Sequence, residues 1–250
     1  MNIVISPKYE HLQGWLSNIA THMVSAGSIV LHNGRNKVVL CESPDGEKVV
    51  IKRYKRHDII KKIAYTFFKN NKAKSAYENA VELRKRGFET PREVAYVEER
   101  AHGLVEQVYF ISAYTGNGPI SEQLSFDKEL ATQYALYVAS LHSKGILHVD
   151  LNSTNVLFAK DSKGYNFELI DINRMKFYDN DVPKTECMEN LTLFWHFDEV
   201  YKHVLEVYAA ARGWNEKETE TAILIKQRHD KRWIRKKRIS RFFGRLFGKR

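Results

Sequence analysis

Three polar residues in one short segment have the types and spacing that a catalytic loop needs. Asp150 follows His148 by two residues and precedes Asn155 by five. A carboxylate in a loop can accept or orient the proton of an attacking hydroxyl. An amide oxygen nearby can bind Mg²⁺, which prefers oxygen ligands and keeps several waters. A His-x-Asp pair alone is common, so its meaning depends on further residues.

Two residues outside that segment extend the set. Asp171 ends the mainly apolar run 167–170, sixteen residues after Asn155, and can offer a second oxygen ligand to a metal. Lys52 ends the β-branched run 49–51, from which its ammonium can reach phosphate groups. Phosphoryl transfer needs a cation on the phosphates, oxygen ligands for Mg²⁺ and an acceptor for the hydroxyl proton. These residues supply each of those parts.

The segment around Lys52 has the pattern of antiparallel strands. Residues 28–31, 37–40 and 48–54 are β-rich, and the turns Asn33-Gly34 and 43–46 separate them. Asn-Gly and Asp-Gly between β-branched runs are strong hairpin signals. We therefore expect three antiparallel strands that carry Lys52 at their end.

The next segments alternate between helical and extended patterns. Apolar residues at helical spacing predict helices over 58–68 and 73–86. Strand-like runs follow at 93–98 and 104–112, and the Gly- and Pro-containing stretch 114–119 is expected to be an irregular connector.

The second half of the chain is mainly helical in pattern. An amphipathic helix is expected over 130–141, closed by Gly145, and helices dominate from Glu189 onwards. This order predicts an α+β protein with a small β-rich N-lobe, a helical C-lobe and a tail. The expected boundaries are residues 1–113 for the N-lobe, 114–225 for the C-lobe and 226–250 for the tail.

Composition narrows the class of protein. With 43% hydrophobic and 28% charged residues, the chain of 250 residues fits a globular protein rather than a disordered one. No run of about 18 apolar residues suggests a spanning helix, and the first residues lack the pattern of a secretory signal. Cys41 and Cys187 have no metal-ligand spacing, which is typical of buried thiols in a reducing compartment. We expect a cytoplasmic protein.

The positive charge belongs to the tail. Residues 226–250 contain twelve Lys or Arg and one Asp, a local charge of +11 within a chain of net +10, which leaves about −1 for the rest. Apolar residues recur in the tail at helical spacing, namely Ile239, Phe242, Phe243, Leu246 and Phe247. Such a helix suits an anionic membrane surface. Nucleic-acid binding and packing on the C-lobe are the alternatives.

The helix expected at 58–68 also carries lysines among its apolar residues. It could be a second membrane contact or could pack on the N-lobe.

Five stretches resemble one family of enzymes. They are AYENA at 76–80, RGFETP at 86–91, LHSKGILHVDLN at 141–152, LIDINR at 169–174 and ENLT at 189–192. On these residues the chain resembles the lipopolysaccharide kinase family, enzymes that phosphorylate Kdo or heptose of the inner core. The resemblance spans roughly 28–212 and implies a protein-kinase-like bilobal fold.

The resemblance also implies roles. Lys52 would bind the α- and β-phosphates of ATP, with Glu78 as its ion-pair partner. Asp150 would be the catalytic base, and Asn155 with Asp171 would bind Mg²⁺. Glu82, one turn after Glu78, is an alternative partner for Lys52.

The chain departs from protein kinases at three places. A single glycine stands in the segment 32–36, where those enzymes have Gly-x-Gly-x-x-Gly; Asp171 is followed by Ile-Asn rather than Phe-Gly; and no Ala-Pro-Glu is present. The last two differences favour an acceptor other than a peptide.

The leading prediction is an ATP- and Mg²⁺-dependent kinase of a Kdo or heptose hydroxyl. Its substrate would be lipopolysaccharide or a lipid A precursor at the inner face of the cytoplasmic membrane. The tail would contact the anionic membrane, and no nucleic-acid partner is expected. Two alternatives stay open: a protein or small-molecule kinase of the same fold, and a non-catalytic module that binds membrane or nucleic acid.

Overall fold

The computed structural model describes residues 1–55, 58–162, 164–196 and 198–246, with side chains as far as Ser240. The chain forms two compact units, Met1–Asn117 with Glu168–Arg174, and Gly118–Phe167 with Met175–Arg250. The predicted lobe boundary after residue 113 lies close to the end of the first stretch. Residues 168–174, expected in the C-lobe, instead belong to the first unit, because backbone contacts hold them there.

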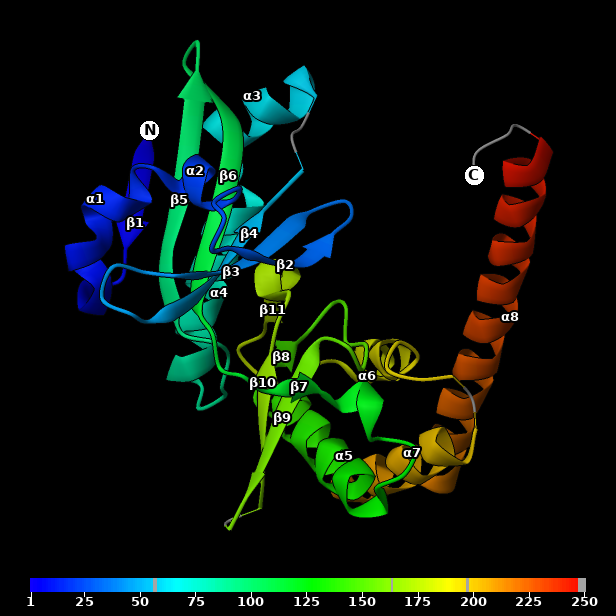
Figure 1. The fold of residues 1–250 in the computed structure, drawn as a ribbon. Helices are drawn as coiled ribbons and strands as arrows, with labels where there is room; N and C mark the ends of the chain where they lie inside the picture. The colour runs from blue at the N-terminus through cyan, green and yellow to red at the C-terminus, as the bar shows by residue number, and fades with distance from the viewer. Residues whose placement is uncertain (56–57, 163, 197, 247–250) are drawn as a thin grey trace. The chain divides into compact units, whose positions relative to one another are not determined.

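A six-stranded antiparallel sheet forms the centre of the first unit (Figure 1). Its strands are β1 (Asn2–Ile5), β2 (Ile29–Asn33), β3 (Lys37–Glu42), β4 (Lys48–Arg53), β5 (Glu93–Ala101) and β6 (Leu104–Ala113). Their spatial order is β1-β5-β6-β4-β3-β2. The five strands expected from the sequence are confirmed, whereas β1, which pairs with β5, was not predicted.

Each face of this sheet has its own core, because side chains alternate between the faces of a strand. One face packs against the N-terminal segment of η1 (Pro7–Leu12), α1 (Gln13–Leu16) and α2 (Ile19–His22). The other face packs against α4 (Lys72–Lys85). The core of this second face includes Tyr54, Ala73 and Tyr96. Lys52 shares the face of Tyr54, two residues along β4, and therefore lies on the α4 side.

The two predicted helices of the first unit are confirmed as α3 (Ile59–Phe67) and α4. The carboxylate of Asp58 accepts from the third backbone N–H of α3 at 3.0 Å. The side chain of Asn71 accepts from two backbone N–H groups of α4, at 3.0 and 3.1 Å. Asp and Asn are among the best residues at this position, because their side chains satisfy N–H groups that the helix leaves unpaired.

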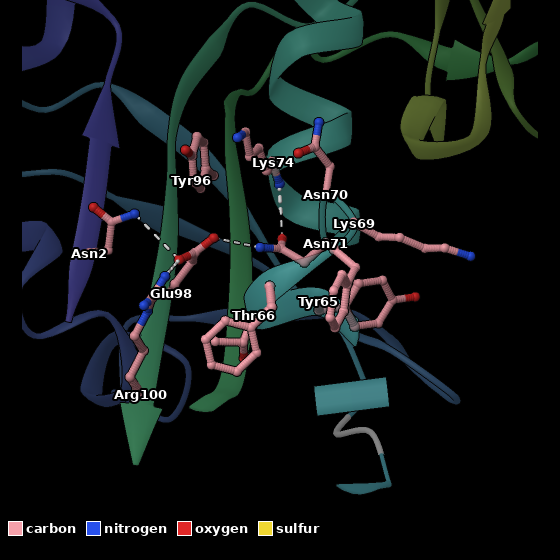
Figure 2. A pocket seen from close by; sticks show the side chains of 12 residues that line it. Asn2, Tyr65, Thr66, Lys69, Asn70, Asn71, Lys74, Tyr96, Glu98 and Arg100 are labelled. Carbon is pink, nitrogen blue, oxygen red and sulfur yellow. Dashed lines mark hydrogen bonds and ion pairs between the residues drawn. The ribbon is translucent and has the colours of Figure 1, made fainter. Parts of the chain in front are cut away.

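A buried glutamate ties the start of α4 to the sheet (Figure 2). Glu98 of β5 accepts from Asn71 at 2.6 Å and from Asn2 of β1 at 3.3 Å, and its carboxylate lies 3.1 Å from Arg100. These residues line a polar hollow of about 370 Å³ together with the end of α3. Since Asn71 also caps α4, the Glu98 cluster determines where that helix begins.

The second unit is mainly helical. Its helices are α5 (Lys128–Ser143), α6 (Lys184–Leu191), α7 (Glu199–Ala211) and α8 (Glu216–Leu246). α5 packs against α7, and α6 packs against α8. Buried aromatic rings fill the space between them, with Phe194 5.4 Å from Tyr134 and 5.2 Å from Tyr201 between ring centroids. The helix predicted over 130–141 is confirmed by α5.

Short strands complete this unit. β7 (Gly118–Pro119), β9 (Val156–Asp161) and β10 (Gly164–Leu169) form one small sheet, and β8 (Ile146–Leu147) pairs with β11 (Lys176–Phe177). The connector expected at 114–119 is irregular only as far as residue 117, because β7 pairs with β9.

Gly145 closes α5 with a φ of 67°, and a Cβ there would collide with the carbonyl oxygens of Tyr178 and Asn180. Only glycine fits this approach. The backbone therefore turns tightly from α5 into β8 and the loop that follows.

The predicted tail is the later part of α8, which already begins at Glu216 (Figure 1). Lys226, the first residue of the expected tail, is 1% exposed. It donates to the backbone oxygens of Thr192 at 3.0 Å and of Trp195, and to Asp230 at 2.9 Å. All ten residues from 231 to 240 are exposed. Of the predicted apolar stripe, Ile239 is exposed, while the other four side chains lie outside the described residues.

Among the described residues, no helix combines the length and the hydropathy that crossing a bilayer requires.

Candidate active site

The first unit brings Lys52 and Asp171 together, although 119 positions separate them in sequence. Lys52 Nζ lies 2.6 Å from Asp171 Oδ1, and the two side chains are 17% and 31% exposed. The ammonium also lies 5.4 Å from the centre of the Tyr54 ring. A half-buried lysine that is already paired with a carboxylate is suited to phosphate binding, because Asp171 holds it in place.

Hydrogen bonds to the neighbouring backbone hold Asp171 in position. Leu169 N donates to Glu89 O at 3.0 Å, and Thr90 Oγ1 donates to Leu169 O at 2.7 Å. On the other side of Asp171, Asn79 of α4 donates to Ile172 O at 2.7 Å. The segment 168–174 is thus anchored by the loop after α4 and by α4 itself.

Asp171 has a φ of 57°, in the left-handed region. Non-glycine residues adopt this conformation uncommonly, although Asp tolerates it better than most. Strained backbone of this kind persists only where surrounding contacts enforce it, and it clusters at functional sites. Here the hydrogen bonds at Leu169 and Ile172, on either side, enforce it.

Lys72 is a functional candidate that the sequence reading missed. The pKa of Lys72 is lowered, chiefly by partial burial and then by the positive charges of Arg35, Arg174 and Lys52; Asp171 opposes this effect. Four cationic side chains, Lys72 included, therefore share one electrostatic environment with the Asp171 carboxylate. Such an excess of positive charge favours a polyphosphate ligand. The signal in the sequence was the position of Lys72 in the first turn after a helix-capping Asn71.

Neither predicted glutamate pairs with Lys52 in this structure. Glu78 accepts from Asn70 at 2.7 Å and lies 3.8 Å from Lys74, and Glu82 pairs with Arg86 at 2.7 Å. Glu78 is exposed, one position from Asn79, whose side chain reaches Ile172. Because successive helical residues point about 100° apart, Glu78 is turned away from the side of α4 that faces Asp171. The predicted Lys52–Glu78 pair is thus replaced by Lys52–Asp171.

The second unit brings Asp150 and Asn155 together in one loop. Asn155 Nδ2 donates to Asp150 O at 2.9 Å, and Asn152 Nδ2 donates to Asp150 Oδ1 at 3.2 Å. Asn155 N donates to Asn152 O at 2.9 Å. The loop therefore holds the Asp150 carboxylate through a neighbouring amide. It also uses the nitrogen end of Asn155 for support, which leaves the oxygen end for a ligand.

A buried chain of polar groups supports this loop from behind. Asn190 Nδ2 donates to His148 O at 2.8 Å, and Asn190 Oδ1 lies 3.2 Å from His142 Nε2. His142 Nδ1 lies 2.7 Å from the Tyr208 hydroxyl. Burial lowers the pKa of His142 to about 4, so its imidazole is neutral at pH 7. Nothing in the sequence pattern around His142 indicates that this side chain is buried.

Asp171 of the first unit and Asn155 of the second unit each offer an oxygen of the kind that Mg²⁺ binds. Asp171 has a carboxylate, and the hydrogen bond made by Asn155 Nδ2 orients that amide with its oxygen available. Mg²⁺ favours few protein oxygens together with water and phosphate oxygens. Within the described residues, no group of three or more His, Cys, Asp or Glu side chains forms a metal cage of another kind.

A hairpin stands where protein kinases have a glycine-rich loop. β2 and β3 pair with a register shift between Val30 and His32, and Gly34 N donates to Asn36 O at 3.2 Å in the turn. The turn carries Arg35, one of the cations that influence Lys72. A charged side chain can therefore contact phosphate groups at this position, where protein kinases use backbone N–H groups.

The profile of the "Lipopolysaccharide kinase (Kdo/WaaP) family" matches residues 32–192, more than half of the chain. No curated protein matches the sequence significantly.

Solved structures are similar in fold at low sequence identity. "WaaP in complex with acyl carrier protein" has a TM-score of 0.56 and 15% identity, covering 89% of this chain and 99% of that one. Two structures of the Rio2 kinase from Chaetomium thermophilum also match. The first has a TM-score of 0.48 at 16% identity, covering 86% of this chain and 76% of that one. The second, an ADP/Mg²⁺-phosphoaspartate complex, has 0.46 at 14%, covering 90% and 78%.

The similarity to WaaP confirms the predicted protein-kinase-like α+β fold. The predicted family resemblance is confirmed by the profile match.

Proposed function

From the premise that the chain belongs to the lipopolysaccharide kinase (Kdo/WaaP) family, we propose that it transfers the γ-phosphate of ATP to a sugar hydroxyl of the inner core, on Kdo or heptose. The observation that carries the proposal is the Lys52–Asp171 pair, 2.6 Å apart on a strained, anchored backbone. It is the arrangement expected of a phosphate-binding lysine next to a metal-binding carboxylate.

Each residue has a defined part in the proposed reaction. Lys52 binds the α- and β-phosphates of ATP, and Asp150 accepts the proton of the sugar hydroxyl as its oxygen bonds to the γ-phosphorus. The bond from that phosphorus to the bridging oxygen breaks, and ADP leaves. Asp171 and Asn155 would hold Mg²⁺, which neutralises charge on the phosphate oxygens when bound. Asn152 orients the Asp150 carboxylate.

We further propose that the reaction takes place at the inner face of the cytoplasmic membrane, where ATP and lipid-anchored precursors are both available. The support is α8, whose residues 231–240 are all exposed and include six Lys or Arg. Basic residues near an anionic leaflet each contribute about 1 kcal/mol to binding.

Phosphate transfer to a Kdo-bearing lipid A precursor tests the proposal. With labelled ATP and Mg²⁺, we expect Asp150→Asn to lower kcat by a factor of roughly 10² to 10⁴, the range for loss of a general base. Asp161→Asn is the matched control, because Asp161 is an exposed carboxylate elsewhere in the same unit. Equal activity of Asp150→Asn and the wild-type protein would refute the assignment.

The acceptor is tested in the same assay. Peptide, aminoglycoside and deacylated core sugar are offered in parallel with the lipid-linked sugar. Faster transfer to a peptide or an aminoglycoside than to any core sugar would favour the alternative of another kinase of this fold.

A further inference from the structure

The helix α3 exposes an apolar face that no described residue of the first unit covers. Five large side chains of α3 and of its C-cap residue Phe68 are solvent-accessible, with exposed fractions of 58% for Ile59, 76% for Ile60, 41% for Ile63, 67% for Phe67 and 79% for Phe68. No residue of α3 is buried. Contiguous exposed apolar surface of this kind marks an interaction site in soluble proteins.

Polar contacts on the other side of α3 hold it in this orientation. Lys62 forms an ion pair with Glu106 of β6, and Val105 N donates to Thr66 Oγ1 at 3.0 Å. In a helical projection, Lys62 and Thr66 lie side by side, whereas Ile60, Ile63 and Phe67 lie on a different face. The helix is thus attached to the sheet through its polar residues, and its apolar face is directed outwards.

Positive charge surrounds the apolar face. Lys55, Lys61 and Lys69 are all exposed, and Figure 2 shows Lys69 extended away from the Glu98 cluster. The acidic side chains next to α3 are already engaged, Asp58 with Lys61 at 2.8 Å and Glu106 with Lys62. The surface therefore combines an apolar stripe with a surplus of cations.

We propose that α3 is a membrane-docking helix that inserts Ile60, Phe67 and Phe68 into the interface of an anionic bilayer. An apolar face flanked by lysines is the signature of a helix that lies in the plane of a membrane. A protein groove would accept the apolar residues but has no need of lysines on both sides of them. The preference for a bilayer also rests on the proposed function, because a lipid-anchored acceptor requires the enzyme at that surface.

The test follows a probe at one position of the full-length chain. An environment-sensitive fluorophore is attached to Ile60→Cys; the two native thiols, Cys41 and Cys187, are buried. Vesicles of phosphatidylcholine with 30% phosphatidylglycerol, without lipopolysaccharide or ATP, are expected to shift the emission to the blue. The same label at Phe126→Cys is the control, because Phe126 is 90% exposed and lies outside α3. Its emission is expected not to change.

The second measurement is vesicle partition of Phe67→Ser/Phe68→Ser, with Phe126→Ser as its control. The double variant is expected to bind these vesicles about tenfold more weakly, because apolar area contributes directly to interfacial binding. Since both rings are exposed, the melting temperature should stay unchanged.

An unshifted probe at residue 60 on protein that co-sediments with vesicles would overturn the proposal. A blue shift that depends on protein concentration without vesicles would also overturn it, in favour of a second copy of the chain. Neither measurement involves phosphate transfer, so failure of the proposed kinase activity would be seen separately.

Discussion

Lys72 provides the sharpest test at the level of single residues. It lies in the first turn of α4, and its pKa is lowered by burial and by the neighbouring cations Arg35, Arg174 and Lys52. Holding such a charge among other cations is unfavourable unless an anion joins them. A triphosphate would provide that anion.

We therefore expect Lys72→Met to raise the KM for ATP about tenfold, with a smaller change in kcat. A hydrogen bond to a charged group contributes about 1.5–3 kcal/mol. Lys74→Met is the matched control, because Lys74 lies two residues along α4 and pairs with the exposed Glu78. Steady-state kinetics with varied ATP measure the KM of both variants. Equal effects of both substitutions would indicate loss of general charge rather than loss of a phosphate contact.

His142 predicts a pH dependence of stability. Its pKa is about 4 in the folded protein and 6.5 as an ordinary value, so the unfolded chain binds the proton more tightly. The contribution of His142 to the unfolding free energy is therefore fully present above pH 6.5 and is lost as the pH decreases towards 4. Between pH 7 and pH 5, this residue alone should remove roughly 2 kcal/mol of unfolding free energy.

Urea unfolding of His142→Gln at the two pH values tests this expectation. The variant should be less stable at pH 7, because it loses the contacts to Asn190 and Tyr208, but its pH dependence should be flatter. His196→Gln is the control, since the His196 side chain is 72% exposed. An unchanged pH slope in His142→Gln would contradict the assignment.

At the scale of elements, the strands and helices with strong periodicity could be predicted. β2, β3 and β4 follow from β-branched runs between Asn-Gly and Asp-Gly turns, and α5 follows from its apolar spacing and Gly145. The N-terminal segment could not be predicted. β1 is four residues long and η1, α1 and α2 are four to six each. Elements this short are stabilised by packing on the sheet rather than by local pattern.

In the candidate site, contacts between residues near one another in sequence could be predicted, and contacts between distant residues could not. Asp150 and Asn155 could be paired from sequence because they share one loop. The partner of Lys52 could not be identified, because it depends on the rotation of α4 and on a segment 119 residues away. Glu78 has the right type and the right helix, but its side chain leaves α4 in the wrong direction. The type of a charged residue does not show in which direction its side chain points from the helix.

At the scale of the whole molecule, only the first part of α8 packs against the second unit. Lys226 is buried and held by Thr192, Trp195 and Asp230, and its Nζ lies 5.0 Å from the centre of the Tyr201 ring. Burial is the main cause that lowers the pKa of Lys226, and Asp230 opposes it. The folded part of α8 therefore extends to Asp230, and exposed helix follows.

A chain that ends after Asp230 should keep its fold and bind anionic membranes more weakly. The deletion removes ten of the forty Lys and Arg residues but no contact of Lys226. We expect an unchanged melting temperature and turnover of a deacylated, soluble acceptor within about twofold. Partition into anionic vesicles and turnover of the lipid-linked acceptor should fall at least about tenfold, given the contribution of each basic residue near a leaflet.

Lys226→Met is the contrasting variant: we expect it to lower the stability of the protein and to leave vesicle binding almost unchanged. It removes the Lys226 donor from two backbone oxygens and one partner from Asp230, which should cost about 1–3 kcal/mol of stability while the basic surface stays almost intact. Loss of folding or of soluble-acceptor turnover in the shortened chain would show that residues beyond 230 support the second unit. Unchanged vesicle partition would instead leave α3 as the sole membrane contact, because it is the remaining exposed apolar and basic helix in the described part of the chain.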